Sequence, residues 1–235
     1  MSSKYIWLVR HSESQGNLER RIQGWKDYPL TTLGRRQAAR LAETMAQEEG
    51  IEKIYTSPLK RAATTAEIVA AVLGLELEHD CRLMEYNFGP LNGLTRDEIK
   101  AQYPQVWQAW QMNDFWAPLP GEEGEQKFEE RVRESMDEIV ASMPDNGVIA
   151  VVMHGGAMNT LVRSWLGVVE RGWRTFAFDN ASISLVQLQP KIDPDNGNII
   201  PNAYNYRMLK TNDVSHLGGL SGSKPTWFSA SKAGH

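Results

Sequence analysis

Two short runs of apolar residues place the strongest limit on the fold of this chain. Residues 5–9 (YIWLV) and 148–153 (VIAVVM) contain no charged side chain, which is typical of strands buried on both faces of a parallel sheet. The chain therefore has to cover a sheet on both sides. Three further strands are expected over 51–56, 181–188 and 203–209.

Segments with helical periodicity alternate with these strands. In residues 32–49 the apolar positions recur at the spacing of one helix face. Ser57 and Pro58 predict the N-cap and the first position of a second helix. Residues 95–113 are expected to be helical, with a break at Pro104. This alternation predicts an α/β fold, a three-layer α/β/α sandwich with a mostly parallel sheet and helices on both faces.

Composition excludes several classes of protein. The 235 residues carry 25 basic and 29 acidic side chains, so the chain lacks the basic excess of a general nucleic-acid binder. A single cysteine, Cys81, excludes an internal disulfide framework and a four-cysteine zinc site. No apolar run approaches the roughly 20 residues that cross a bilayer, and the apolar stretch at the N-terminus is too short for a signal peptide. We expect a soluble, cytoplasmic protein that binds neither nucleic acid nor membrane.

No linker divides the chain, so a single domain is expected over residues 1–217. Residues 218–235 are rich in glycine and serine and are expected to form a loosely held tail.

Two histidines occupy matching places in the pattern. His11 follows the first apolar strand, and His154 follows the strand over residues 148–153. Ligand sites of open α/β sheets form at the carboxyl ends of the strands, so the two side chains are expected to face one crevice. A structural role for a strand-end histidine is the alternative.

Two arginines belong to the same edge of the sheet. Arg10 precedes His11, and Arg61 lies in the first turn of the helix that follows residues 51–56. Arginine binds phosphate through a rigid fork of donors, and Asn17 could add neutral donors. Histidine can attack phosphorus and form a covalent intermediate. These residue types predict a pocket for a phosphoryl group, although a surface arginine on a helix is usually only a solvated charge.

Transfer of a phosphoryl group also needs a proton donor for the leaving oxygen. Glu85 lies among apolar and aromatic residues, an environment that can raise the pKa of a carboxyl group toward neutrality. A local cap or ion pair is the alternative role for Glu85. Glu13 is a second candidate. Glu122, Glu123 and Glu125 lie in a loop rich in proline and glycine and are expected to form a solvated face.

Four motifs in order give the sequence a clear resemblance. Residues 8–13 (LVRHSE), with Asn17, resemble the Arg-His-Gly-Glu signature of the histidine phosphatase superfamily, also called phosphoglycerate mutase-like. Residues 57–62 (SPLKRA), 83–93 (LMEYNFGPLNG) and 151–156 (VVMHGG) match its later motifs. The resemblance implies the phosphoglycerate mutase-like form of the α/β/α sandwich.

The resemblance also implies roles for individual residues. It makes His11 the nucleophile that becomes phosphohistidine, and Glu85 the group that protonates the leaving oxygen and then activates water. It implies no metal and no cofactor. The residues expected to hold the phosphoryl group are Arg10, Arg61 and His154, with help from Asn17, and Gln23 is expected to line the pocket.

The sequence departs from the family at Ser12, where a glycine is usual, so the local backbone or the pocket shape is expected to differ.

Family mutases carry a longer insertion between the acid and the second histidine. Here Glu85 and His154 are only 69 positions apart, and the helical lid insertion spans about residues 94–130. The short lid favours a phosphomonoester hydrolase that acts on a small phosphorylated metabolite. A hydrolase of broad specificity is one version of this expectation. A phosphoglycerate mutase is the alternative within the family, and a non-catalytic phosphate-binding regulatory module is the alternative from another class.

Aromatic residues in the lid give a hypothesis about the substrate. Residues 103–116 contain five of them, and Trp107 and Trp110 share a helix face, which favours packing onto the body of the domain. The functional alternative is that Trp116, with Tyr86 and Phe88, lines an apolar pocket for the leaving group. The expected partner is a small phosphomonoester, and a homodimer through an exposed sheet edge is a further expectation.

Overall fold

The computed structural model describes residues 2–48, 50–112, 119–168 and 175–220. Its centre is a sheet of six strands in the order β3-β2-β4-β1-β5-β6. The first four of these are mutually parallel, β5 runs antiparallel to β1, and β6 runs antiparallel to β5. The strands are β1 (Lys4–Arg10), β2 (Ile51–Thr56), β3 (Leu77–His79), β4 (Val148–Met153), β5 (Ile183–Ile192) and β6 (Ile199–Asp213).

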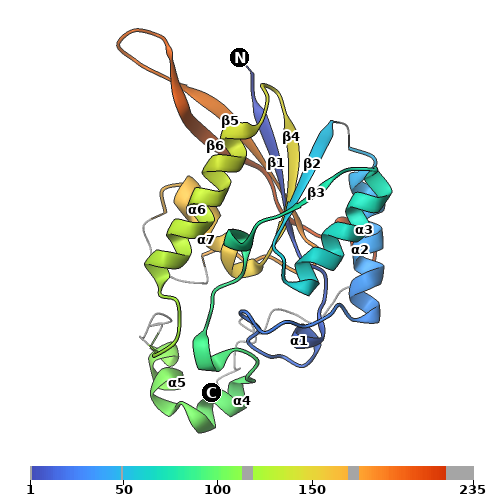
Figure 1. The fold of residues 1–235 in the computed structure, drawn as a ribbon, viewed down its shortest axis with the longest axis vertical. Helices are drawn as coiled ribbons and strands as arrows, with labels where there is room; N and C mark the ends of the chain where they lie inside the picture. Colours follow the sequence, from blue (N-terminus) through green and yellow to red (C-terminus); the bar gives the residue numbers. More distant parts are fainter. Residues whose placement is uncertain (1, 49, 113–118, 169–174, 221–235) are drawn as a thin grey trace, which may run out of the picture.

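Helices cover both faces of this sheet, and the predicted three-layer sandwich is confirmed (Figure 1). Trp7 and Val9 of β1 pack in one core with α2 (Thr32–Met45) and α3 (Lys60–Leu73). Ile6 and Leu8, which point to the opposite face, pack in a second core with α6 (Glu125–Ser142) and α7 (Gly155–Trp165). Successive side chains of a strand alternate between faces, so a strand without charged residues can fill two cores at once.

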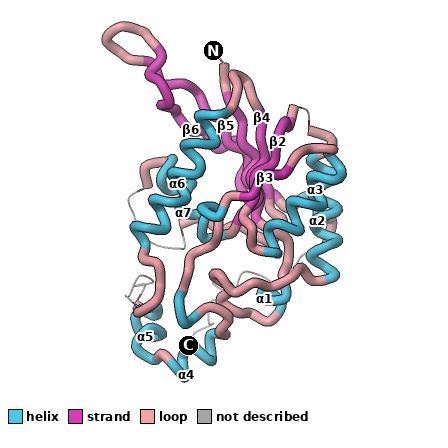
Figure 2. Tube along the Cα trace, viewed as in Figure 1, coloured by secondary structure: helices cyan, strands magenta, loops and turns pink. Residues whose placement is uncertain are grey.

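The helical lid lies beyond the end of the sheet, away from the loop of the β5–β6 hairpin (Figures 1 and 2). It contains α4 (Arg96–Gln102) and α5 (Pro104–Gln111), so the predicted break at Pro104 is confirmed. Trp110 is buried in the core, and Trp107 packs against it. Packing onto the body of the domain is therefore the role of these two rings. Trp116 lies outside the described residues.

Some element boundaries differ from the sequence predictions. The first long helix, α2, ends at Met45 instead of residue 49. Ser57 does not cap α3, because that helix begins at Lys60 after Leu59, without a side-chain cap. Short elements complete the chain: α1 (Gln15–Leu18) and three turns of 3₁₀ helix at Cys81–Leu83, Gly89–Leu91 and Ser215–Leu217. None of the described helices is long and apolar enough to cross a membrane.

Strand register brings the ends of β1 and β4 together, where His11 and His154 follow. β1 and β4 pair in parallel from Tyr5 opposite Val148 to Arg10 opposite Met153. The pairing continues for one more bond, because the His11 N–H donates to the Met153 carbonyl at 2.9 Å. The residues that follow the two strands therefore share one edge of the sheet.

Candidate active site

His11 and His154 lie next to each other at this edge. Their ring centres are 5.2 Å apart, with an angle of 58° between the ring planes. The sequence places these residues 143 positions apart, and parallel pairing of β1 with β4 closes that distance. The predicted juxtaposition of the two histidines is present in the structure.

The His11 ring is held in one tautomer. Only 3% of the residue is exposed, and its Nδ1 lies 2.8 Å from the Ser12 carbonyl. A carbonyl oxygen can only accept, so Nδ1 carries the proton and Nε2 keeps its lone pair. Burial, followed by the charges of Arg61 and Arg10, lowers the pKa of His11 well below 6.5. His11 is therefore neutral at neutral pH, as a nucleophile must be.

His154 is oriented by Ser57, a residue that sequence reasoning assigned to a helix cap. The His154 Nε2 lies 2.8 Å from the Ser57 Oγ, and that oxygen accepts from the Leu59 N–H at 3.3 Å. The Ser57 hydroxyl has one hydrogen that it can donate to Nε2, and in that arrangement the His154 proton lies on Nδ1. Burial and the charge of Arg61 lower the pKa of His154 well below 6.5.

Two buried guanidinium groups flank the histidines. Arg10 donates from Nη1 to the Phe178 carbonyl at 2.5 Å. Arg61, of which 1% is exposed, donates from Nη2 to the Gly24 carbonyl at 2.7 Å and from Nη1 to the Lys26 carbonyl at 3.2 Å. Burial lowers the pKa of both arginines, that of Arg61 to about 10. Both groups keep their positive charge at neutral pH and are fixed before any ligand binds.

A cavity of about 50 Å³ lies beside His11, Arg10 and Arg61, and His154 is buried behind it without belonging to its lining. That volume suits a group of a few heavy atoms. It brings together seven of the residues predicted from sequence. The lining consists of Arg10, His11, Asn17, Arg21, Ile22, Gln23, Gly24, Arg61, Glu85 and Phe88.

Glu85 presents its carboxylate at this cavity and is tied to the second histidine through the backbone. Its Oε1 accepts from the Tyr86 N–H at 3.0 Å. Its Oε2 accepts from the Gly156 N–H at 2.9 Å, in the first turn of the helix that starts directly after His154. A carboxyl group that lines the cavity is a candidate proton donor for a group bound there.

Asn17 is fixed by a neighbour that sequence reasoning missed. Its Oδ1 accepts from the Ser14 N–H at 3.1 Å and from the Asn180 Nδ2 at 3.2 Å. These bonds set the orientation of the amide and leave the Asn17 Nδ2 as the donor for a ligand. Asn180 also donates to the His11 carbonyl at 3.1 Å. No motif around Asn180 indicated this role.

The predicted substrate contacts fall into two groups. Gln23 and Phe88 line the cavity, and the Gln23 Oε1 accepts from the Ser14 Oγ at 2.7 Å. Tyr86 does not line it, because its ring is buried edge-on against Phe88 and Phe128 and its hydroxyl donates to Glu122. Burial and this carboxylate raise the pKa of Tyr86. Tyr86 is thus a core residue beside the site.

One further expectation needs correction. Glu123 does not belong to a solvated face: only 6% of its side chain is exposed, and it pairs with Arg131 at 2.8 Å. Ser12 causes no backbone strain, because its φ lies outside the left-handed region that favours glycine. Its N–H donates to the Thr65 Oγ1 at 3.1 Å, while its buried Oγ makes no hydrogen bond within the described residues. A pocket shape that differs from the family stays a prediction.

Within the described part of the chain, no group of three or more histidine, cysteine and acidic side chains could hold a metal ion. Action without a metal stays a prediction.

Comparison with known proteins gives one consistent family. The sequence model of the histidine phosphatase superfamily (branch 1) matches residues 6–192. A probable phosphoglycerate mutase GpmB from Escherichia coli O1:K1 is 35% identical over 213 residues, which are 90% of this chain and 94% of the relative. Among solved structures, YhfR from Bacillus stearothermophilus is 30% identical with a TM-score of 0.76, over 91% of this chain and 99% of its own.

A mycobacterial glucosyl-3-phosphoglycerate phosphatase is similar to the same extent. It is 29% identical with a TM-score of 0.75, over 89% of this chain and 99% of its own. These matches include proteins named as a phosphatase and as a mutase, over nearly their full lengths. Together with the paired histidines and buried arginines, they establish that the chain belongs to the histidine phosphatase superfamily.

Proposed function

We propose that this protein is a phosphomonoester hydrolase that acts through phosphohistidine at His11. One observation carries the proposal. Three buried nitrogen atoms of the residues next to His11, the Arg10 Nε, the Arg61 Nε and the His154 Nδ1, make no hydrogen bond within the described residues. Buried donors without partners are costly. A bound phosphoryl group would supply acceptors for such donors.

The geometry supports a transfer in two steps. In the first, the His11 Nε2 attacks phosphorus, the bond from phosphorus to the ester oxygen breaks, and the proton of Glu85 passes to that oxygen. In the second, Glu85 takes a proton from water, the water oxygen attacks phosphorus, and the bond to Nε2 breaks. Inorganic phosphate is then released. Arg10, Arg61, Asn17 and His154 would stabilise the charge on the phosphoryl oxygens in both steps.

The charges at the cavity favour a substrate with one phosphate. Arg21 is a further cation of the lining, but it pairs with Glu19 at 2.6 Å and with Glu98 at 3.2 Å. Arg10 and Arg61 line the cavity without a direct ion pair among the described residues, although the charge of Glu85 acts on both. A single phosphoryl group would be bound there. Phe88 offers an apolar contact beside it. We infer that the substrate is a small phosphomonoester, and broad specificity is part of this proposal.

A phosphoglycerate mutase is the second candidate, and the relative named as a probable mutase favours it. The two activities differ in the fate of the phosphoryl group. Interconversion of phosphoglycerates without net release of phosphate would favour the mutase. Net release of phosphate would favour the hydrolase, for which the phosphatase among the solved structures is the precedent.

The first test measures phosphate release from p-nitrophenyl phosphate in the presence of EDTA. Wild type should turn over, and His11→Ala should lower kcat by several orders of magnitude. His79→Ala, which changes an exposed histidine of β3, is the matched control. Tight binding of phosphate without turnover by wild type would instead favour a regulatory module. Activity that EDTA abolishes would overturn the expectation of action without a metal.

Two expectations about context belong to the same proposal: a cytoplasmic location and a homodimer. The β6 strand is at one edge of the described sheet, and it is the edge that a second copy could extend. Size-exclusion chromatography with light scattering would decide the oligomeric state, with a monomer as the contradicting result.

A further inference from the structure

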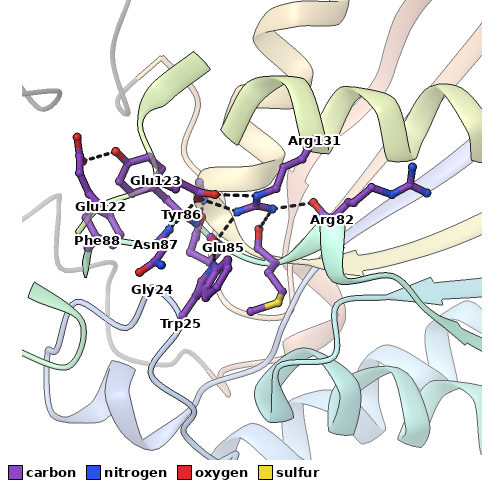
Figure 3. Close-up of polar contacts among 12 residues, drawn as sticks. Gly24, Trp25, Arg82, Glu85, Tyr86, Asn87, Phe88, Glu122, Glu123 and Arg131 are labelled. Carbon is purple, nitrogen blue, oxygen red and sulfur yellow. Dashed lines mark hydrogen bonds and ion pairs between the residues drawn. The ribbon is translucent and has the colours of Figure 1, made fainter. Parts of the chain in front are cut away.

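Arg131 of α6 makes a dense set of contacts just outside the cavity. Its guanidinium donates to the carbonyl oxygens of Arg82 and Met84, each at 2.7 Å, and to that of Glu85 at 2.9 Å. It also donates to both carboxylate oxygens of Glu123, at 2.9 and 2.8 Å. Figure 3 shows these bonds converging on one side chain. Three of the five N–H donors of the guanidinium are thus directed at residues 82–85, the segment that carries the proposed acid, and the other two at Glu123.

The Glu85 backbone is fixed from two sides by these contacts. Its carbonyl accepts from the Arg131 Nη2 and, at 2.8 Å, from the Trp25 Nε1. A carbonyl oxygen has two lone pairs, so this acceptor is saturated. The Gly156 N–H holds the carboxylate end at the same time. The position of the carboxyl group therefore depends on groups from three separate parts of the chain.

Glu123 completes the arrangement from the segment that follows the lid. Its Oε1 accepts from the Asn87 N–H at 2.8 Å, and its own N–H donates to the Asn87 carbonyl at 3.1 Å. The ion pair between Glu123 and Arg131 is mostly buried, with 6% and 14% of the side chains exposed. The Glu123 carboxylate thus connects the segment that follows the lid to Arg131 of α6 and to Asn87, two residues after Glu85 (Figure 3).

We propose that Arg131 and Glu123 are positioning residues that set the Glu85 carboxyl group for proton transfer at the His11 cavity. The inference rests on the proposed function, since it assigns these residues to the proton-transfer step of that reaction. Neither side chain belongs to the lining of the cavity, so both act through Glu85. The Glu123 carboxylate pairs with Arg131, and the proposed action is through the position of Glu85. A displacement of about 1 Å can cost on the order of 100-fold in rate.

Two esters of similar shape separate this role from a general structural one. Phenyl phosphate releases a basic oxygen that needs a proton, and p-nitrophenyl phosphate releases a far less basic one. In Arg131→Met we expect kcat/KM for phenyl phosphate to fall by about 100-fold, and that for p-nitrophenyl phosphate to fall much less. Glu123→Gln should shift the same ratio in the same direction by a smaller factor. Inhibition by inorganic phosphate should stay as in wild type, because Arg10 and Arg61 are unchanged.

Arg133→Met is the matched control, because it removes an exposed arginine from the same helix. It should leave both esters as in wild type. Circular dichroism and thermal unfolding show whether each variant folds, and if Arg131→Met does not, Arg131→Lys and Glu123→Gln decide the question by the same ratio.

The outcomes separate the two proposals. Equal losses for both esters in the folded variants, or no loss for either, would overturn the positioning role while the hydrolase stands. Absence of wild-type turnover on both esters would overturn the hydrolase itself, and with it the positioning role.

Discussion

The carboxylate of Glu85 accepts a hydrogen bond from the Gly156 N–H, with 2.9 Å between Oε2 and the nitrogen. Gly156 is the second residue after His154, at the start of α7. This bond links the proposed acid to the helix that follows the second histidine, across 71 positions of sequence. The acid and the phosphoryl-binding groups are thereby held in one rigid frame, as proton transfer to a leaving oxygen requires.

Replacing Glu85 should change how the rate depends on the leaving group. In Glu85→Gln, we expect kcat/KM for phenyl phosphate to fall by about 10²- to 10⁴-fold, the usual share of general acid catalysis. The loss for p-nitrophenyl phosphate should be much smaller, because nitrophenolate leaves without a proton. Steady-state kinetics with both esters measure the difference. A loss of the same size for both would remove Glu85 from the acid role.

Arg61 should determine affinity for phosphate as well as rate. Its guanidinium is fixed by two carbonyls and lines the cavity, and a hydrogen bond to a charged group contributes about 1.5–3 kcal/mol. In Arg61→Met we expect inhibition by inorganic phosphate to weaken by about 10- to 100-fold. Arg36→Met, on the exposed side of α2, is the control. Unchanged inhibition in Arg61→Met would show that this residue is not a phosphate ligand.

Ser57 should act through the tautomer of His154. In Ser57→Ala the His154 Nε2 loses its hydrogen-bond donor, so the ring is free to carry its proton there. We expect kcat/KM to fall by about 10-fold, and stability to fall by about 1–3 kcal/mol for the buried atom left unpaired. Ring ¹⁵N chemical shifts report the tautomer directly. If shifts and activity match those of Ser142→Ala, whose hydroxyl donates to the Ile139 carbonyl of the same helix, the assigned role is wrong.

The buried histidines should make the fold sensitive to acid. Burial lowers the pKa of His11 and of His154 well below 6.5, so below that pH the unfolded chain binds protons that the folded chain does not. Stability is therefore full above about pH 6.5 and is lost as the pH falls, by about 1.4 kcal/mol per pH unit for each histidine. In His11→Gln, urea unfolding between about pH 6 and pH 5 should show a slope smaller by this amount. The control His79→Gln, which changes an exposed histidine, should keep the wild-type slope. A wild-type slope in His11→Gln would contradict the assignment.

Sequence patterns predicted the parts of the site that depend on strand order. Buried parallel strands bring their carboxyl ends to one edge, and this is why His11 and His154 could be placed together from sequence. The same argument placed Arg10 and Arg61 at that edge, because Arg10 ends β1 and Arg61 lies in the first turn of the helix that follows β2.

Contacts between distant side chains could not be predicted in this way. A serine before a proline reads as a helix cap, and nothing local to Ser57 indicates a histidine 97 positions away. Arg131 lies on a helix with other charged residues, and its three carbonyl partners are set by how α6 packs. Tyr86 and Phe88 have the same aromatic character, yet only Phe88 lines the cavity.

Trapping the covalent intermediate tests the central claim most directly. Wild-type protein mixed with p-nitrophenyl phosphate is quenched in alkali, where phosphohistidine survives, and digested for mass spectrometry. The account predicts a phosphoryl group on the peptide that contains His11, and none in His11→Ala. Turnover by wild type without this adduct, or with the phosphoryl group on another residue, would contradict it.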